Sequence, residues 1–359
     1  MLKSAYNFKK RIIFALRKFT IKFWILRILK KILSHITKYL LPMMLGIGIF
    51  WLLYRQFDWR EIMTLLSEDM NYFLVVISML VGVVSHIARA LRWQLQLRTL
   101  DIRPSFGTLC NAIFGTYAFN LVLPRFGELW RCTYMSNHEK ASFSRVFGSM
   151  LSDRVVDGIT AITIVGAVFL SQMGVAATFL RQNPNMQQNI HNLLTTPWLY
   201  IALIIVAGVL LCIFKYKSNN KLLNKIRETL RKMAEGFNSV LSMKRGKFLF
   251  LLYTIIIWGC YFLQLYICIF AFDWMSHVTL IQALVLFVLG SIGMTVPVQG
   301  GIGPWHAAVI FGMMFYGFTQ EQAGAFALIA HGSQMIVTIL LGIYTTIAVL
   351  CERQRNKQP

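Results

Sequence analysis

Apolar runs that suit membrane-spanning helices recur along most of the chain, and polar segments separate them. A helix needs about 20 mainly apolar residues to cross the hydrocarbon core of a bilayer. The pattern therefore predicts an all-α fold, a polytopic helical membrane protein with about six full spans. The expected spans are Leu40–Tyr54, Tyr72–Ala90, Val155–Leu170, Trp198–Phe214, Phe248–Phe272 and Ile329–Leu350.

Two further regions contain apolar stretches that proline and glycine interrupt. In the first, "LPRFGELWR" (Leu123 to Arg131) separates Gly107–Leu123 from Phe143–Leu151, which are too short to be two spans. In the second, "VPVQGGIGPWH" (Val296 to His306) interrupts the stretch 280–318. Non-helical backbone at membrane depth is tolerated only where protein buries it or it lines a wet cavity. We therefore expect two re-entrant helical hairpins, although two unrelated loops are the alternative.

The distribution of basic residues sets the expected topology. The first 38 residues carry eleven basic side chains and no acidic one, with apolar residues at helical spacing between them. This pattern predicts an interfacial helix on anionic headgroups. The segment Lys215–Lys247 carries ten basic residues against two acidic ones, whereas Arg55–Asn71 carries four acidic residues against two basic ones. Cytoplasmic loops are enriched in Lys and Arg, so both termini are expected in the cytoplasm.

Counting passages between these anchors places the two hairpins on opposite faces of the membrane. The halves then form an inverted repeat, as in many transporters. The expected organisation is a basic amphipathic leader (1–38), a first membrane half (39–214) with a hairpin at about 105–154, a basic cytoplasmic loop (215–247), a second half (248–350) with a hairpin at about 280–318, and a cytoplasmic tail (351–359). The expected location is the cell inner (plasma) membrane, with multiple passes.

Composition agrees with a membrane protein. The chain is 57% hydrophobic and 14% charged, whereas soluble domains carry about 25% charged residues. The formal net charge of +22 arises from 36 basic and 14 acidic residues. These basic residues flank apolar runs, which favours topology signals and anionic lipid and excludes nucleic acid as a partner. The six cysteines show no CxxC spacing, so we expect no disulfide, metal or cofactor.

Ionisable residues gather in the first half. A charge at membrane depth costs at least about 2.5–3.5 kcal/mol on insertion scales, so such residues usually pair or serve a function. Asp153 and Asp157 share one helix face, and Arg125 or Arg154 can neutralise one of them while the arginines bind a lipid phosphate. The alternative is a salt-bridge network that only stabilises the hairpin. The candidate residues are Arg125, Glu128, Arg131, Asp153, Arg154 and Asp157.

In the second half, the candidate binding groups are backbone N–H groups at glycine residues. Gly300, Gly301 and Gly303 can expose backbone N–H groups, and a helix that begins near Pro304 would direct its positive end at a phosphate. A P-loop is excluded because no GK[ST] follows. His306 can titrate near neutral pH, although a lone histidine is more often a packing residue.

Arg89 and Arg92, with Trp93, end the second span. We interpret them as snorkelling and anchoring side chains at the cytoplasmic interface. A role in admitting an anionic headgroup is secondary.

These motifs resemble the lysylphosphatidylglycerol synthase transmembrane-region family, the flippase-like integral membrane proteins. The likeness spans about Leu40 to Leu350. The resemblance implies translocation of a lipid with a charged or phosphorylated headgroup. Bifunctional relatives carry a cytoplasmic synthase domain, which does not follow Leu350 here, so aminoacyl transfer is not expected. Relatives often carry glutamate at the position of His306, so no carboxylate role is transferred to it. The resemblance rests on Arg89, Arg92 and Trp93, on Asn120, Pro124, Arg125, Gly127, Glu128 and Arg131, on Arg154 and Asp157, and on Pro297, Gly300, Gly301 and Gly303.

Three functions remain open from the sequence. The leading one is a lipid transporter or flippase without catalytic residues, whose partner is an anionic or phosphorylated membrane lipid. The second is a glycosyltransferase that uses a polyprenyl-phosphate donor, with Glu128 and Asp153 or Asp157 as carboxylates, although no DxD metal pair is present. The third is a non-transporting partner of a lipid-modifying enzyme. The sequence specifies no oligomeric state.

Overall fold

The computed structural model describes residues 40–123, 126–174 and 246–355, together with isolated positions between 188 and 243. Within these residues, four helices are long and apolar enough to cross a membrane. The prediction of an all-α polytopic helical membrane protein is confirmed. The basic leader, the span Trp198–Phe214 and the loop 215–247 lie wholly or mostly outside the described residues. The four helices are α4 (Tyr72–Arg98), α7 (Phe143–Ser171), α12 (Lys247–Phe270) and α15 (Gln320–Arg355).

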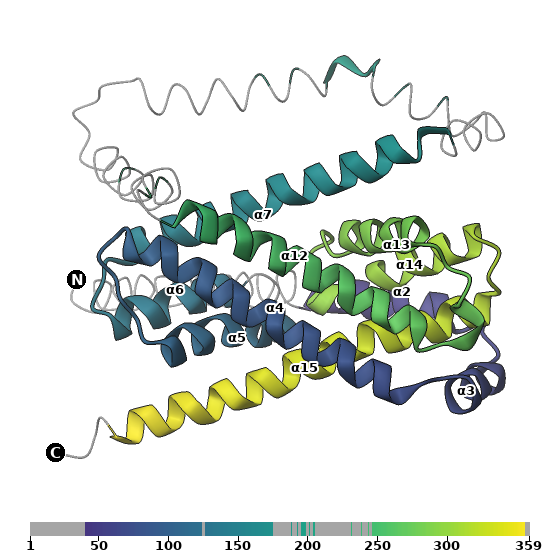
Figure 1. Cartoon of the computed structure of the whole chain (residues 1–359), viewed down its shortest axis with the longest axis horizontal. Helices are drawn as coiled ribbons and strands as arrows, with labels where there is room; N and C mark the ends of the chain where they lie inside the picture. The colour runs from purple at the N-terminus through teal and green to yellow at the C-terminus, as the bar shows by residue number, and fades with distance from the viewer. Residues whose placement is uncertain are drawn as a thin grey trace, which may run out of the picture.

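Helices α4 and α12 pack along each other in opposite directions (Figure 1). At one end of the pair, the Asn71 N–H donates to the carbonyl of Ala271 over 2.7 Å, just before α4 and just after α12. At the other end, Gly246 lies against Leu95. The Asn71 side chain also accepts hydrogen bonds from the N–H groups of Phe73 and Leu74, which caps α4. The antiparallel pair joins the two halves of the chain.

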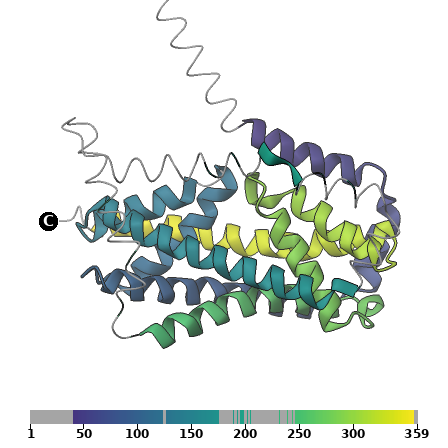
Figure 2. The same ribbon diagram turned by 90° about the horizontal axis from the view of Figure 1, so that it is seen from above.

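Helix α15 runs along the bundle from one end to the other (Figure 1 and Figure 2). Near its start, the carbonyl of Gly324 accepts a hydrogen bond from the Tyr54 hydroxyl over 3.1 Å. Near its end, the Glu352 carboxylate accepts a hydrogen bond from the Tyr134 hydroxyl over 3.1 Å. The Thr319 hydroxyl accepts from the N–H of Gln322 and so caps the start of the helix. This long helix contacts elements of both halves.

The first hairpin consists of α5 (Phe106–Val122) and α6 (Phe126–His138). The helices approach so closely at Gly127 that a Cβ atom there would overlap the carbonyl oxygen of Thr116. The expectation that Phe143–Leu151 forms the second arm is wrong, because this stretch is the start of the continuous α7. The second arm is α6, whose sequence "FGELWRCTYMSNH" mixes polar and apolar residues and so shows no apolar run.

The second hairpin consists of α13 (Leu280–Gly293) and α14 (Pro304–Phe315), joined through the short 3-10 helix η3 (Gln299–Gly301). Pro304 opens α14, as the sequence predicts. A Cβ atom at Gly293 would stand 2.7 Å from the carbonyl oxygen of Pro304, so the two arms are again in close contact. Gly300 adopts φ 59°, which glycine accommodates without steric cost.

The two halves repeat the same order of elements: a long helix, a short pair and a second long helix. The hairpins extend from opposite ends of the bundle (Figure 1), and their tips meet near its centre. There, Leu121 at the end of α5 and Met335 of α15 both reach the space next to Gly300. Helix α2 (Leu41–Tyr54) and the short α3 (Trp59–Glu68) precede the repeated elements within the first half, and α2 packs Gly46 against the carbonyl of Ile302.

Candidate functional site

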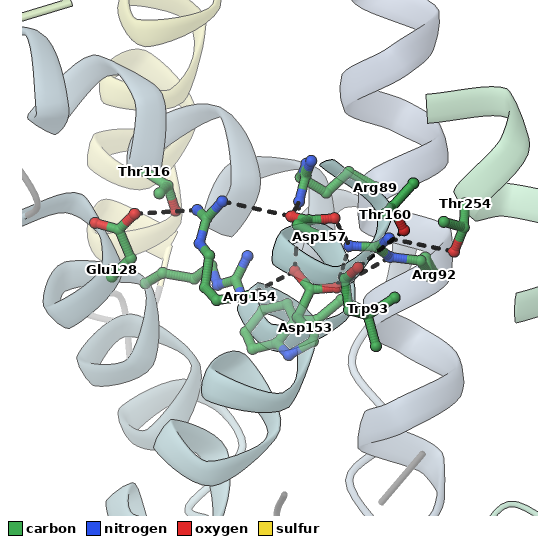
Figure 3. Close-up of polar contacts among 12 residues, drawn as sticks. Arg89, Arg92, Trp93, Thr116, Glu128, Asp153, Arg154, Asp157, Thr160 and Thr254 are labelled. Atoms are coloured by element: carbon green, nitrogen blue, oxygen red, sulfur yellow. Dashed lines mark hydrogen bonds and ion pairs between the residues drawn. The ribbon is translucent and has the colours of Figure 1, made fainter. Parts of the chain in front are cut away.

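Four charged side chains from α4 and α7 form a compact ion-pair cluster (Figure 3). Arg92 donates from Nε and Nη2 to Asp153 Oδ1 at 3.0 and 2.6 Å, and Nη2 also donates to Asp157 Oδ1 at 2.7 Å. Arg89 donates from Nη1 to Asp157 Oδ2 at 2.5 Å. Arg92 and Asp153 are completely buried, and Arg89 is 3% exposed. Pairing compensates part of the cost of placing these charges inside the bundle.

Arg131 of α6 approaches the cluster from the other side. Its guanidinium lies 4.1 Å from the ring centroid of Trp93 and 3.6 Å from Asp153 Oδ2. The Trp93 indole in turn donates to the Ser149 hydroxyl over 3.1 Å. Arg131 is fully buried, and none of its nitrogens makes a hydrogen bond to the described protein atoms. Attraction to Asp153 and the cation–π contact therefore hold it in place.

Arg154 is the most exposed arginine of the group, with 31% of its side chain accessible. It lies 3.1 Å from Glu128 Oε1 and 3.7 Å from Asp157 Oδ2. Asn120 supports Glu128 by donating its amide to the same carboxylate over 3.4 Å, and its Oδ1 accepts from the Gly127 N–H over 2.8 Å. Asn120 thus fixes both the start of α6 and the acid.

The cluster carries an excess of positive charge. Four guanidinium groups (Arg89, Arg92, Arg131 and Arg154) stand beside three carboxylates (Glu128, Asp153 and Asp157), and the difference is one positive charge. An arginine-rich pocket of low dielectric attracts an anion more strongly than the same charges would in water.

A cavity of about 540 Å³ lies between the halves and has this cluster at one end. Helices α4, α6 and α7 contribute its charged residues, α5 contributes Tyr117, Asn120 and Leu121, and the second hairpin contributes residues 294–298 together with Gly300 and Gly301. Ligand pockets in proteins typically measure about 300–1,000 Å³. The cavity is therefore large enough for a small polar group and lies at the meeting point of the two hairpin tips.

Of the residues predicted from the sequence, six line the cavity, two are buried behind its wall and two lie elsewhere. Gly303 packs against α2, where a Cβ atom would press on the Gly46 carbonyl. The ring of His306 lies between Phe50 and His331. Arg125 lies outside the described residues. The lining residues are Asn120, Glu128, Arg154, Asp157, Gly300 and Gly301, and the buried ones are Arg131 and Asp153.

Arg89 and Arg92 do not snorkel at an interface, and that interpretation is wrong. Both side chains are buried, and Arg89 also lines the cavity. The arginines point into the bundle because the acids of α7 and the hydroxyl of Thr254, which accepts from Arg92 over 3.2 Å, face them there. In the sequence, an arginine at the end of an apolar run looks the same whether its side chain snorkels to the interface or is buried in the bundle.

The sequence analysis did not identify several neutral polar residues of the site. Tyr117, Tyr261 and His86 line the cavity. His331 donates from Nε2 to the carbonyl of Gly300 over 2.9 Å and so supports the glycine turn. In the sequence, Tyr117 could have been identified by its position one helical turn before Asn120. Tyr261 has no charged neighbour in the sequence. Within the described parts of the chain, no group of His, Cys, Asp or Glu could hold a metal ion.

Membrane-crossing helices, two opposed hairpins and a cavity lined by arginine between them define this chain as a polytopic membrane protein with an internal polar site. The chain belongs to the lysylphosphatidylglycerol synthase transmembrane-region family, whose model matches residues 39–342. It is also 26% identical over 269 residues to the UPF0104 membrane protein PH1989 of Pyrococcus horikoshii, and that alignment covers 68% of this chain and 77% of the relative. No solved structure matches the chain.

Proposed function

We propose that this protein moves a lipid with a charged or phosphorylated headgroup between the leaflets of the plasma membrane, without catalysing a reaction. The observation that carries the proposal is the cavity, which both halves line and which holds an arginine-rich cluster at one end. Charged residues at membrane depth usually mark a substrate pathway. The termini would lie in the cytoplasm, as the basic segments indicate.

Arg154 is the side chain that would meet the headgroup first. It is the most accessible arginine of the cluster, and it lines the cavity. Guanidinium binds phosphate oxygens through two parallel N–H donors. Arg89, fixed by Asp157, would add a second positive charge close to the same place.

Transport requires that the headgroup site be exposed to each side in turn. The hairpins extend from opposite ends of the bundle and meet at Gly300 and Leu121. In transporters built from inverted repeats, one half rocks against the other around a site near the bilayer midplane. The same motion here would open one hairpin tip while the other stays closed.

The geometry favours transport over glycosyl transfer, because the carboxylates of the site are already paired. Asp157 accepts from Arg89 and Arg92, Asp153 is completely buried, and Glu128 lies beside Arg154. A general base needs a carboxylate that can reach the proton of an acceptor. Asp153 and Asp157 lack that freedom, and Glu128 is held through Oε1 by Arg154 and Asn120, although its Oε2 has no partner among the described residues.

The test is lipid movement in proteoliposomes. The purified chain would be reconstituted with a phospholipid that carries a fluorophore on an acyl chain, and a membrane-impermeant quencher would report the exposed fraction over time. Arg154→Gln is expected to slow exchange about tenfold or more, because hydrogen bonds to charged groups contribute about 1.5–3 kcal/mol. Arg103→Gln, an exposed arginine outside the cluster, is the matched control.

Two outcomes would overturn the proposal. One is a rate of exchange no greater than in vesicles without protein. The other is formation of a glycosylated product from a lipid-linked sugar with no exchange between leaflets, which would establish the enzyme instead.

A further inference from the structure

The cavity reaches the surface of the bundle at one side, between α7 and the second hairpin. Gly158 of α7 lines the cavity and is also exposed, and the same is true of Met294, Thr295 and Pro297 of the second hairpin. At Gly158, no atom of the described structure outside the adjoining turns of α7 lies within 4 Å of the position that a Cβ atom would take. The cavity is therefore open where these residues meet.

Helix α7 lies at an edge of the bundle (Figure 1) and is attached to it on both sides of Gly158. Before Gly158, Asp157 pairs with the arginines of α4. After it, Ile164 packs against the core cluster that includes Phe287 of α13. Between these attachments α7 presents Gly158 and Ala161 to the cavity. Because both residues are small, they leave room next to the second hairpin.

The surface around the opening is mainly apolar. Helix α7 is long and apolar enough to cross a membrane, and Gly158 lies near its middle. Since about 20 residues span the hydrocarbon core, and exposed apolar patches mark membrane contact, the opening faces the bilayer interior. The exposed apolar side chains around it are Val155, Ile159 and Ile162 of α7 and Ile292 and Met294 of the second hairpin.

The cavity has room for a headgroup but not for a whole phospholipid. Its volume of about 540 Å³ is typical of pockets for drug-sized ligands, and a lipid with two long chains is larger. Arg154, the proposed headgroup contact, precedes Gly158 by one helical turn, about 6 Å along the axis. A headgroup at Arg154 would therefore place the start of its hydrocarbon chains at the opening.

We infer that the opening at Gly158 is a lateral portal, through which the hydrocarbon chains of the lipid extend from the cavity into the bilayer. This inference rests on the proposed function and specifies where the chains lie while the headgroup occupies the cavity. Gly158 keeps the portal free because it has no side chain.

The test is photolabelling of the full chain in phosphatidylcholine vesicles. Trace amounts of phosphatidic acid, phosphatidylglycerol and phosphatidylethanolamine, each with a diazirine on the acyl chain close to the glycerol, would be activated by light, and labelled peptides would be identified by mass spectrometry. Met335 lines the cavity, whereas Leu340, on the same helix α15, is exposed outside it. Label at Met335 reports chains that have entered the portal, and label at Leu340 reports lipid of the surrounding bilayer.

Gly158→Trp fills the portal with a large side chain, where the described structure has no neighbouring atom to displace. This variant is expected to lose the label at Met335, to keep the label at Leu340 and to lose lipid exchange in proteoliposomes. Gly166→Trp is the matched control, because Gly166 lies on the same helix, has nothing within 4 Å of the added Cβ atom and does not line the cavity. The control is expected to keep both labels and to exchange lipid.

A reversible block separates closure of the portal from misfolding. In a chain whose six native cysteines are replaced, Gly158→Cys would be modified with an apolar aromatic thiol reagent and then reduced. Exchange is expected to stop on modification and to return on reduction. The same treatment of Gly166→Cys is expected to leave exchange unchanged.

The outcomes separate the portal from the proposed function. Label at Met335 that persists in Gly158→Trp, or that is absent from the wild type, overturns the portal. Exchange that continues in Gly158→Trp or in modified Gly158→Cys also overturns it and leaves the transport proposal standing. If the label depends on Gly158 as expected but no lipid changes leaflet, the portal stands and the transport proposal fails.

Discussion

Asp153 is the residue on which the charged cluster depends. Its Oδ1 accepts two hydrogen bonds from Arg92, and its Oδ2 lies 3.6 Å from both Arg89 and Arg131. Three guanidinium groups thus surround one fully buried carboxylate. Arg131 has no other acid within ion-pairing distance in the described structure, so its burial depends on this single partner.

Asp153→Asn is therefore expected to destabilise the fold. The change removes a negative charge but leaves Arg92 and Arg131 buried, and loss of one partner from a buried ion pair costs about 3–5 kcal/mol. The free energy of unfolding would be measured in detergent micelles by titration with a denaturing detergent. Asp101→Asn is the control, because Asp101 is exposed and has φ 58°, a conformation that asparagine tolerates. A change below about 0.5 kcal/mol, as at ordinary surface sites, would show that the network does not depend on this acid.

The sequence predicted which residue types form the site better than it predicted their roles. Glu128, Arg154 and Asp157 stood out because charges are rare in such an apolar chain, and all three line the cavity. Tyr117 and Tyr261 carry no such signal, because tyrosine is common at membrane interfaces and in packed cores. Only the three-dimensional arrangement places their hydroxyls beside Arg89.

At the scale of elements, close helix contacts at glycine build both hairpins. Gly127 faces Thr116 across the first hairpin, and Gly293 faces Pro304 across the second. Small residues let helix backbones approach closely in membranes, where apolar burial gives little driving force between helices. The breaks at proline and glycine were visible in the sequence. The arm α6 was not, because the charged residues that serve the site interrupt its apolar pattern.

Gly127→Ala is expected to separate the arms of the first hairpin. The added methyl group would overlap the Thr116 carbonyl, which is backbone and cannot rotate away. Overpacking of this kind typically costs about 1–3 kcal/mol, and the displaced Asn120 would release Glu128. Thermal unfolding in detergent would measure the loss. Gly166→Ala in α7, where nothing lies within 4 Å of the added atom, is the control and is expected to retain wild-type stability. Equal stability of both variants would contradict the predicted contact.

A second contact between elements depends on pH. The ring of His138 at the end of α6 lies 2.6 Å from Glu352 of α15 and 2.9 Å from Glu139. Burial lowers the pKa of His138, but hydrogen bonds to Glu352 and Glu139 outweigh it, and the net pKa is raised above 6.5. The stabilisation is therefore complete below the unfolded pKa and is lost as pH rises through the folded pKa.

His138→Gln is accordingly expected to lower the melting temperature at about pH 6, below the unfolded histidine pKa of about 6.5, and to have little effect at high pH, where the wild-type ring is neutral. Melting curves across this range would measure the difference. His277→Gln, on an exposed histidine outside the ion pairs of the described structure, is the control. A difference between wild type and His138→Gln that does not change with pH would show that protonation of His138 does not join the two helices.

At the scale of the whole molecule, the two halves meet along the long pair α4 and α12, along α15, between α7 and α13, between α2 and α14, and at the hairpin tips. The site lies where the halves meet, with charged side chains from one half and backbone turns from the other. A rocking motion would therefore change the cavity without breaking the ion pairs among α4, α6 and α7. The inverted order of elements could be inferred from charge and apolar runs alone. The meeting of the tips at Gly300 could not, since it depends on how two hairpins distant in the sequence pack.

Cross-linking the first hairpin tip to the second half tests whether this motion is needed. Leu121 at the end of α5 and Met335 of α15 both reach the space next to Gly300, so cysteines at these two positions, in a chain whose six native cysteines are replaced, can be joined by a short cleavable reagent. We expect the cross-link to stop lipid exchange, and cleavage to restore it, because the first hairpin tip can no longer separate from α15. Each single-cysteine variant, treated with the same reagent, controls for obstruction of the cavity. Cysteines at Phe119 and Trp130, whose rings lie 4.8 Å apart within the first hairpin, form a pair that moves as one body, so joining them is expected to leave exchange largely intact. Full exchange with the first tip joined to α15 would mean that the lipid crosses without relative motion of the two halves at this contact.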